Sequence, residues 1–264
     1  MLLKWYCIIK IVQNQGKIKL SENNLIDLAL AGVKWEILEE PNIAIQTTQK
    51  PQTKQNRTAT TVVPTIVPVV PLSVETVSAM AMRPADIHVL IRMIGEFNHP
   101  LRAGATNVVL PHIAPKPNGI LIITDIPGSD DDATGNILSG ATGELLDKML
   151  NAIGMGRDNV HIVPLLFWRT PGGRTPVREE LDLARPFVNR LIDFINPKFI
   201  LTLGDLATKE ISGQTLAKSC GKISELSGGI KILPIYHPNY MILKPISKRE
   251  VWDALQELQK LLKM

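Results

Sequence analysis

Four short apolar runs, separated by segments of helical character, constrain the fold of this chain more than any other feature. The runs cover residues 119–125, 160–166, 199–203 and 231–236. Each is almost continuous in apolar residues, as expected of strands that are covered on both faces. Strands that alternate with helices through short connections indicate a mostly parallel sheet. The sequence therefore predicts a three-layer α/β/α sandwich with a four-stranded parallel sheet.

The segments around these runs carry helix signals, namely capping residues, apolar side chains at helical spacing and acidic first turns. They predict helices over residues 86–97, 142–153 and 175–195, a short helix from residue 205 and a last helix from residue 247. Pro186 should kink or divide the third of these, because proline removes a backbone donor and clashes with the preceding turn.

Composition divides the chain into three regions. Residues 1–40 contain a plausible amphipathic helix over residues 22–35, which predicts an N-terminal helical segment. Residues 41–84 are rich in Gln, Thr, Lys and Pro and predict a flexible linker with a polyproline-like end. Residues 85–264 are expected to form one compact domain.

Charge and cysteine content restrict the class of protein. The net charge of +4 and the many Lys and Arg residues suit a polyanionic partner, although many proteins without one are equally basic. Two cysteines, Cys7 and Cys220, are too few for a disulfide framework or a four-cysteine metal site. The apolar start is too short to span a membrane, since about 20 apolar residues are needed. We therefore expect a cytoplasmic protein without membrane association.

Polar residues directly follow each apolar run. They are Asp125 with further aspartates at 130–132, then Trp168, Arg169 and Arg174, then Asp205, and finally His237. Ligands of open parallel sheets bind at the carboxyl ends of the strands. The sequence therefore predicts that acidic, basic and imidazole groups converge on one rim of the sheet.

Four segments resemble motifs of family 4 uracil-DNA glycosylases. TDIPGSDDDATGNILSGATGELLDKML resembles the first motif, GEAPGxxED followed by GxPFVGxAGxLLDxML, and FWRTPGGRTP resembles the RPPGNRTP segment. INPKFILTLGDLA and HPNYMILKPISKREVW resemble the third and fourth. They occur in the family's order over residues 85–264, so this region is identified as a member of the uracil-DNA glycosylase superfamily.

The resemblance implies a DNA glycosylase of base-excision repair that hydrolyses the N-glycosidic bond of uracil, or of a related damaged base. Asp125 takes the place of the family's catalytic Glu, and His237 matches the histidine that stabilises the base anion. Cleavage develops positive charge on the sugar and negative charge on the base. A carboxylate and a histidine donor suit these two charges. The implied partner is uracil-containing DNA, and we expect a monomer.

The resemblance also assigns contact residues. The implied substrate-binding residues are Ile126, Pro127, Gly128, Asp132, Leu138, Pro164 and Asn239. The implied DNA-binding residues are Arg174, Tyr240, Met241, Lys248 and Arg249, with Ile242 in the same minor-groove wedge segment.

Several positions depart from the family pattern. Asp125 is one methylene shorter than Glu, Leu138 replaces a base-stacking Phe, and Pro164 replaces an Asn that reads uracil. By this alignment, residues 99, 168 and 184 (His, Trp and Ala) occupy iron–sulfur cysteine positions. We therefore expect no iron–sulfur cluster, no other cofactor and no metal.

These departures leave other hypotheses open. One is a catalytically impaired DNA-binding domain of the same fold, and another is a metal- or nucleotide-using hydrolase that exploits the aspartates at 130–132. Those aspartates are equally explained by a solvated turn or a helix cap. Arg174 is also explained by an ion pair with a neighbouring carboxylate, Phe167 and Trp168 by packing, and Cys220 as an inert loop thiol.

Overall fold

The computed structural model describes residues 7–11, 17–20, 35–37, 73–226 and 228–262, which fall into two units, Met1–Ile66 and Val67–Met264. In the first unit, β1 (Cys7–Ile11) pairs antiparallel with both β2 (Lys17–Leu20) and β3 (Trp35–Ile37). The structure thus has strands in the region where the sequence predicts a helical segment. Residues 21–34, which carry most of the predicted helix, lie outside the described residues, and Trp35 belongs to β3.

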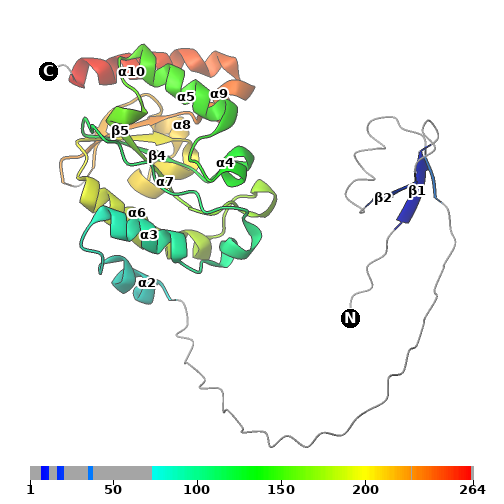
Figure 1. Ribbon diagram of the computed structural model, residues 1–264. Helices are drawn as coiled ribbons and strands as arrows, with labels where there is room; N and C mark the ends of the chain where they lie inside the picture. The colour runs from blue at the N-terminus through cyan, green and yellow to red at the C-terminus, as the bar shows by residue number, and fades with distance from the viewer. Residues whose placement is uncertain (1–6, 12–16, 21–34, 38–72, 227, 263–264) are drawn as a thin grey trace, which may run out of the picture. The chain divides into compact units, whose positions relative to one another are not determined.

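The second unit is built on a five-stranded sheet of order β5-β4-β6-β8-β7 (Figure 1). Its parallel strands are β4 (Ile120–Thr124), β5 (Val160–Pro164), β6 (Phe199–Leu203) and β8 (Lys231–Ile235). They confirm the four predicted strands. The edge strand β7 (Ser224–Glu225) runs antiparallel and was not predicted, because two residues carry no periodic signal.

Helices cover both faces of this sheet, which confirms the predicted three layers. One layer contains α2 (Val74–Ala81), α3 (Ile87–Glu96), α6 (Arg178–Ile195) and α7 (Asp205–Ser212). The other contains α5 (Gly140–Ala152), α9 (Pro238–Leu243) and α10 (Lys248–Leu262), as Figure 1 shows. Shorter elements connect them: α4 (Ser129–Thr134), α8 (Leu216–Ser219), and the 3-10 helices η1 (Pro100–Gly104), η2 (Arg157–Asn159), η3 (Pro171–Gly173) and η4 (Pro245–Ser247).

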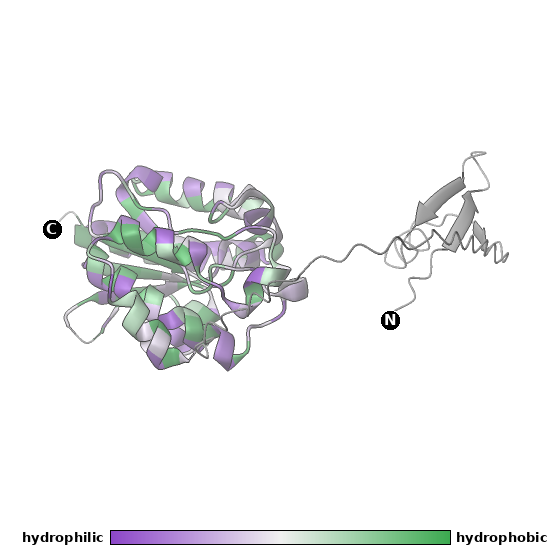
Figure 2. Cartoon of the chain, turned by 60° about the horizontal axis from the view of Figure 1, so that its bottom comes forward, coloured by the Kyte–Doolittle hydropathy of each residue, from purple (hydrophilic) through white to green (hydrophobic). Residues whose placement is uncertain are grey.

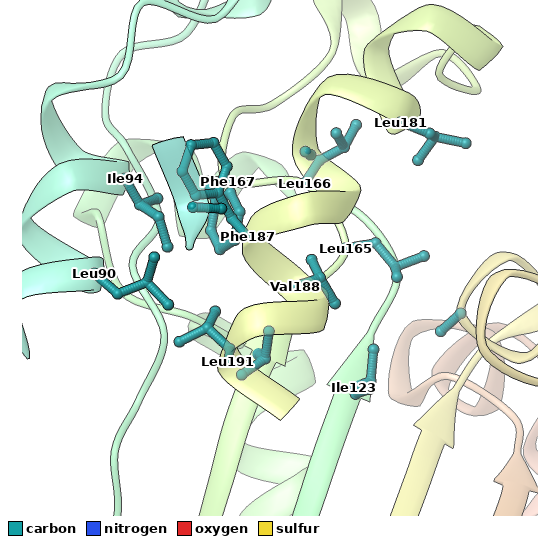
Figure 3. Packing of buried hydrophobic residues seen from close by; sticks show 14 of the residues in the cluster. Leu90, Ile94, Ile123, Leu165, Leu166, Phe167, Leu181, Phe187, Val188 and Leu191 are labelled. Atoms are coloured by element: carbon teal, nitrogen blue, oxygen red, sulfur yellow. The ribbon is translucent and has the colours of Figure 1, made fainter. Parts of the chain in front are cut away.

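The alternation of side chains along each strand divides the core into two clusters. In β4, Leu121 and Ile123 pack toward α3 and α6, whereas Ile120 and Ile122 pack toward α5 and α10. Figure 3 shows Phe187, Val188 and Leu191 of α6 between α3 and the sheet. The strands are correspondingly hydrophobic in Figure 2, and the outer sides of the helices are hydrophilic. Burying each such side chain contributes about 1.5–3 kcal/mol, so the two clusters fix the sheet between its helices.

Two boundaries differ from the sequence prediction. Helix α2 lies within the predicted linker, where Ser73 caps it and Val77 is fully buried in the cluster beside α6. The compact domain therefore begins before residue 85. Pro186 lies inside one continuous helix and does not divide it.

Within the ranges that the structure describes, no helix is long and apolar enough to cross a membrane.

Candidate active site

A cavity of about 570 Å³ lies at the carboxyl ends of the parallel strands. The strand register aligns these ends, since Thr124 of β4 pairs with Leu203 of β6, which pairs with Ile235 of β8. Asp125 follows β4, His237 follows β8, and both line the cavity. The structure thus brings the carboxylate and the imidazole, which are 112 positions apart in the sequence (237 − 125), to one site.

Asp125 reaches across the end of β6 to the start of α7. Its Oδ1 accepts a hydrogen bond of 2.6 Å from the backbone N–H of Ala207. Gly204 makes this approach possible, because a Cβ built there would lie 2.1 Å from Asp125 Oδ2. Gly204 also has a φ of 102°, a left-handed conformation that glycine adopts without strain. Residue 204 therefore has to be glycine for Asp125 to occupy this position.

The electrostatic environment of Asp125 favours its protonated form. The pKa of this carboxyl is raised to about 7, mainly by burial and to a lesser extent by the nearby Asp205. The backbone N–H groups of Ala207 and Leu206 oppose the rise because they stabilise the carboxylate. Asp125 therefore exchanges its proton near neutral pH, as a general base does.

His237 is held at both ring nitrogens. Its Nδ1 accepts a hydrogen bond of 3.2 Å from the backbone N–H of Asn239, at the start of α9. The proton of the neutral ring therefore lies on Nε2, which donates to Thr124 Oγ1 at 3.0 Å. Burial lowers the pKa of His237 to about 4. At neutral pH the site thus contains an uncharged imidazole with its hydrogen on Nε2.

The aspartates after β4 mainly stabilise the loop. Asp131 caps α4, since its Oδ2 accepts from the Gly128 N–H at 2.9 Å and its Oδ1 from the Ser139 N–H at 2.6 Å. Asp132 Oδ1 accepts from the Thr106 N–H at 2.8 Å and does not line the cavity, where the sequence places it. Within residues 73–226 and 228–262 no group of three or more His, Cys, Asp or Glu side chains is arranged to hold a metal ion.

The two residues expected to stack on the base and read its edge do not line the cavity. Leu138 is 2% exposed and packs in the core on the α5 side. Pro164 is a buried residue at the end of β5. The wall next to Asp130 is instead formed by Ala141 and Thr142. By contrast, the predicted Ile126, Pro127 and Gly128 do line the cavity, as the adjoining loop requires.

Helix α9 forms the opposite wall. Asn239, Tyr240 and Ile242 line the cavity, and Leu243, which the sequence analysis did not single out, lies beside them and is 74% exposed. Met241 is buried in the core instead, because it faces the sheet side of this short helix. The remaining predicted DNA contacts, Lys248 and Arg249, are exposed at the start of α10, outside this cavity.

The basic residue at the cavity is not the one that the sequence predicts. Arg174 forms a two-pronged ion pair with Glu180 in the first turn of α6, with nitrogen–oxygen distances of 2.9 and 2.5 Å. Arg169 lines the cavity beside Gly173, and in the described part of the chain it has no carboxylate partner. The sequence signal that could have identified Arg169 was its place directly after the second apolar run.

The three positions aligned with iron–sulfur cysteines come together in the core beside α6. The rings of His99 and Trp168 stack at 4.5 Å between centroids and 4° between planes, and they are 1% and 0% exposed. His99 Nδ1 accepts from the Leu101 N–H, and its Nε2 bonds to the Glu180 carbonyl. Ala184 is buried one turn further along α6. These residues supply no thiolate and do not fit an iron–sulfur cluster.

The fold and the cavity define the class of protein: an open α/β sheet with a partly buried carboxyl and a neutral imidazole at the carboxyl ends of its parallel strands. Comparison with known proteins identifies the family. The model of the uracil DNA glycosylase superfamily matches residues 110–259, which is more than half of the chain. The protein therefore belongs to the uracil DNA glycosylase superfamily.

Individual relatives agree with this assignment. The chain is 29% identical over 165 residues to the type-4 uracil-DNA glycosylase of Archaeoglobus fulgidus, covering 59% of this chain and 82% of the relative. It is 30% identical over 167 residues to that of Sulfurisphaera tokodaii, with shares of 59% and 75%. For the enzyme of Thermotoga maritima the identity is 32% over 146 residues, with shares of 54% and 76%.

Proposed function

We propose that this protein is a uracil-DNA glycosylase of base-excision repair, which hydrolyses the N-glycosidic bond of uracil, or of a related damaged base, in DNA. The observation that carries the proposal is the convergence of Asp125 and His237 on one cavity in a member of this superfamily. The names of the relatives, type-4 uracil-DNA glycosylases, support the same substrate.

The two side chains suit the two charges of the reaction. Water adds its oxygen to the sugar carbon and gives a proton to the Asp125 carboxylate, while the bond to the base breaks and its electron pair leaves with the base. Ionised Asp125 stabilises the positive charge on the sugar and orients the water. His237, neutral at pH 7, donates from Nε2 to the oxygen of the departing base, where negative charge develops.

The walls of the cavity supply the remaining contacts. We assign Ile126, Pro127 and Gly128 to one side of the extruded base and Asn239 and Tyr240 to the other. An extruded base needs a flat apolar partner. Tyr240 lines the cavity, with its ring stacked on Tyr236 at 4.9 Å between centroids, and we assign its exposed part to this contact, whereas Leu138 is buried.

We assign the DNA backbone contacts to Arg169 at the cavity, with Lys248 and Arg249 at the start of α10. The cation of Arg169 is available for a phosphate, while that of Arg174 is already paired with Glu180. We further propose that the enzyme acts as a cytoplasmic monomer without an iron–sulfur cluster. Metal analysis of aerobically purified protein checks the last point, since bound iron would contradict it.

Release of uracil from an oligonucleotide tests the proposal. The full chain should release uracil from a single- or double-stranded uracil-containing substrate, and His237→Ala should lower the rate by about a hundredfold, as expected for loss of a donor to a developing anion. Lys260→Ala, at an exposed residue in the last turn of α10 that does not line the cavity, serves as the control. No release from either substrate would refute the proposed activity.

One observation favours a second candidate function, a catalytically impaired DNA-binding domain. The residues aligned with the base-stacking Phe and the edge-reading Asn, Leu138 and Pro164, do not line the cavity. A site without such contacts loses discrimination between bases. Salt-sensitive binding to DNA without release of any base would identify this alternative.

A further inference from the structure

Thr124 holds His237 from beneath the cavity. Thr124 is the last residue of β4, and its side chain is buried. Its Oγ1 lies 3.0 Å from His237 Nε2, although His237 follows β8 and β6 lies between the two strands. The contact therefore joins the ends of two strands that are not neighbours in the sheet.

This hydrogen bond and the one from the Asn239 N–H together fix the orientation of the imidazole ring. The Asn239 N–H binds Nδ1 and so determines which nitrogen carries the proton, while Thr124 Oγ1 determines where the Nε2 hydrogen points. Without the hydroxyl, the Nε2–H would lose its acceptor in a partly buried position, and rotation of the ring would relieve that loss.

The hydroxyl is also a departure from the motif that this segment resembles. The motif that residues 124–128 resemble, GEAPG, begins with glycine where this chain has Thr124. A glycine has no side chain to accept a hydrogen bond, so the contact with His237 exists only because of this replacement.

We propose that Thr124 is a positioning residue, whose hydroxyl holds His237 as a neutral Nε2–H donor at the cavity until the departing base takes over the hydrogen bond. This rests on the proposed glycosylase function. A neutral hydroxyl is a weaker acceptor than an anionic base oxygen. The donor therefore moves to the base as negative charge develops, which favours the transition state over the ground state.

The test compares Thr124→Val with Thr124→Ser and with Thr202→Val. Thr202 is a matched control, because it is a fully buried threonine of the adjacent strand β6 whose hydroxyl bonds to Thr208 and not to His237. Nitrogen NMR of the imidazole reports its tautomer and hydrogen bonding, and single-turnover and steady-state release of uracil report kcat and KM.

Thr124→Val should shift the His237 Nε2 signal and lower kcat by about tenfold to a hundredfold, as expected for a misplaced catalytic group, with little change in KM. Thr124→Ser should restore both, and Thr202→Val should change neither. Unaltered NMR signals and kcat in Thr124→Val would overturn the proposal, as would equal losses in Thr124→Val and Thr202→Val. A wild-type protein that released no base would contradict the proposed function, yet the NMR comparison would still decide whether Thr124 holds His237.

Discussion

Burial shifts the pKa values of Asp125 and His237 in opposite directions, and both shifts favour the uncharged side chain. The pKa of Asp125 rises to about 7, and the pKa of His237 falls to about 4. The proposed reaction needs the ionised carboxylate and the neutral imidazole. The carboxyl therefore limits activity near neutral pH, while the imidazole remains in its working form down to about pH 4.

The rate of uracil release should accordingly rise with pH through a midpoint near 7, because Asp125 loses its proton there. The working form of His237 would be lost only near pH 4, where the ring becomes charged. Single-turnover rates between pH 5 and 9 check this. A rate that is constant from pH 5 to 8 would show that Asp125 is already ionised at pH 5.

The same shift predicts how stability depends on pH. The folded state holds the Asp125 proton up to about pH 7 while the unfolded chain releases it near its ordinary value of 3.8, so this group lowers stability as pH rises through that window. Asp125→Asn removes the effect. We expect the variant to gain about 3 kcal/mol over wild type between pH 5 and pH 8. Urea unfolding at both values measures it, and an equal difference at both would contradict the raised pKa.

Gly204 is the residue whose replacement should damage the site most directly. In Gly204→Ala, the new methyl group would displace Asp125 and the φ of 102° would be strained. We expect the release of uracil to fall at least about tenfold, since a small misplacement of a catalytic group has such effects.

Gly213→Ala is the matched control for this prediction. Gly213 has a φ of 70° at the end of α7, but a Cβ there would meet nothing within 4 Å. It should lose about 1–2 kcal/mol of stability from strain alone and keep its activity. Equal activity of the two variants would show that the position of Asp125 is unimportant.

At the scale of elements, the sequence predicted those helices and strands that carry a periodic or capping signal. The four apolar runs became β4, β5, β6 and β8, and Asp86 caps α3. Helices α2, α4 and α9 have at most eight residues and show little periodicity, so they were missed.

The residues of the candidate site also divide into those that the sequence predicts and those that it does not. Asp125 and His237 could be placed from the rule that ligands bind at strand ends. The contacts of Thr124 and Gly204 could not be predicted, because they depend on which strands are neighbours and how far side chains reach across them. Arg169 and Arg174 lie on the same loop, and only the ion pair with Glu180 distinguishes them.

The stack of His99 on Trp168 joins the segment before η1, the loop after β5 and helix α6. Trp168→Ala should therefore lower the free energy of unfolding by about 3–5 kcal/mol, the usual cost of emptying such a core position. Trp252→Ala on α10, where the ring is partly exposed, should lose much less. Chemical denaturation measures both, and similar losses would show that the stack contributes little.

At the scale of the whole molecule, the basic charge of the chain should act at the cavity through Arg169. Arg169→Ala should reduce the slope of log affinity for uracil-containing DNA against log salt by about one. Arg174→Ala should leave that slope nearly unchanged and lower stability, since its guanidinium binds Glu180. Binding titrations at several salt concentrations decide between them, and the reverse pattern would restore Arg174 as the phosphate contact.

The aromatic packing beside α6 also bears on whether this domain needs a metal in order to fold. The rings of Trp168 and His99 stack on each other in this layer, so the proposed absence of an iron–sulfur cluster predicts that the layer assembles without delivery of a metal. Burial raises the pKa of the Cys220 thiol to about 12, which keeps it from forming the thiolate that oxidants attack. We therefore expect the domain to fold equally well when it is expressed without added iron, and its Cys220 thiol to react slowly with peroxide.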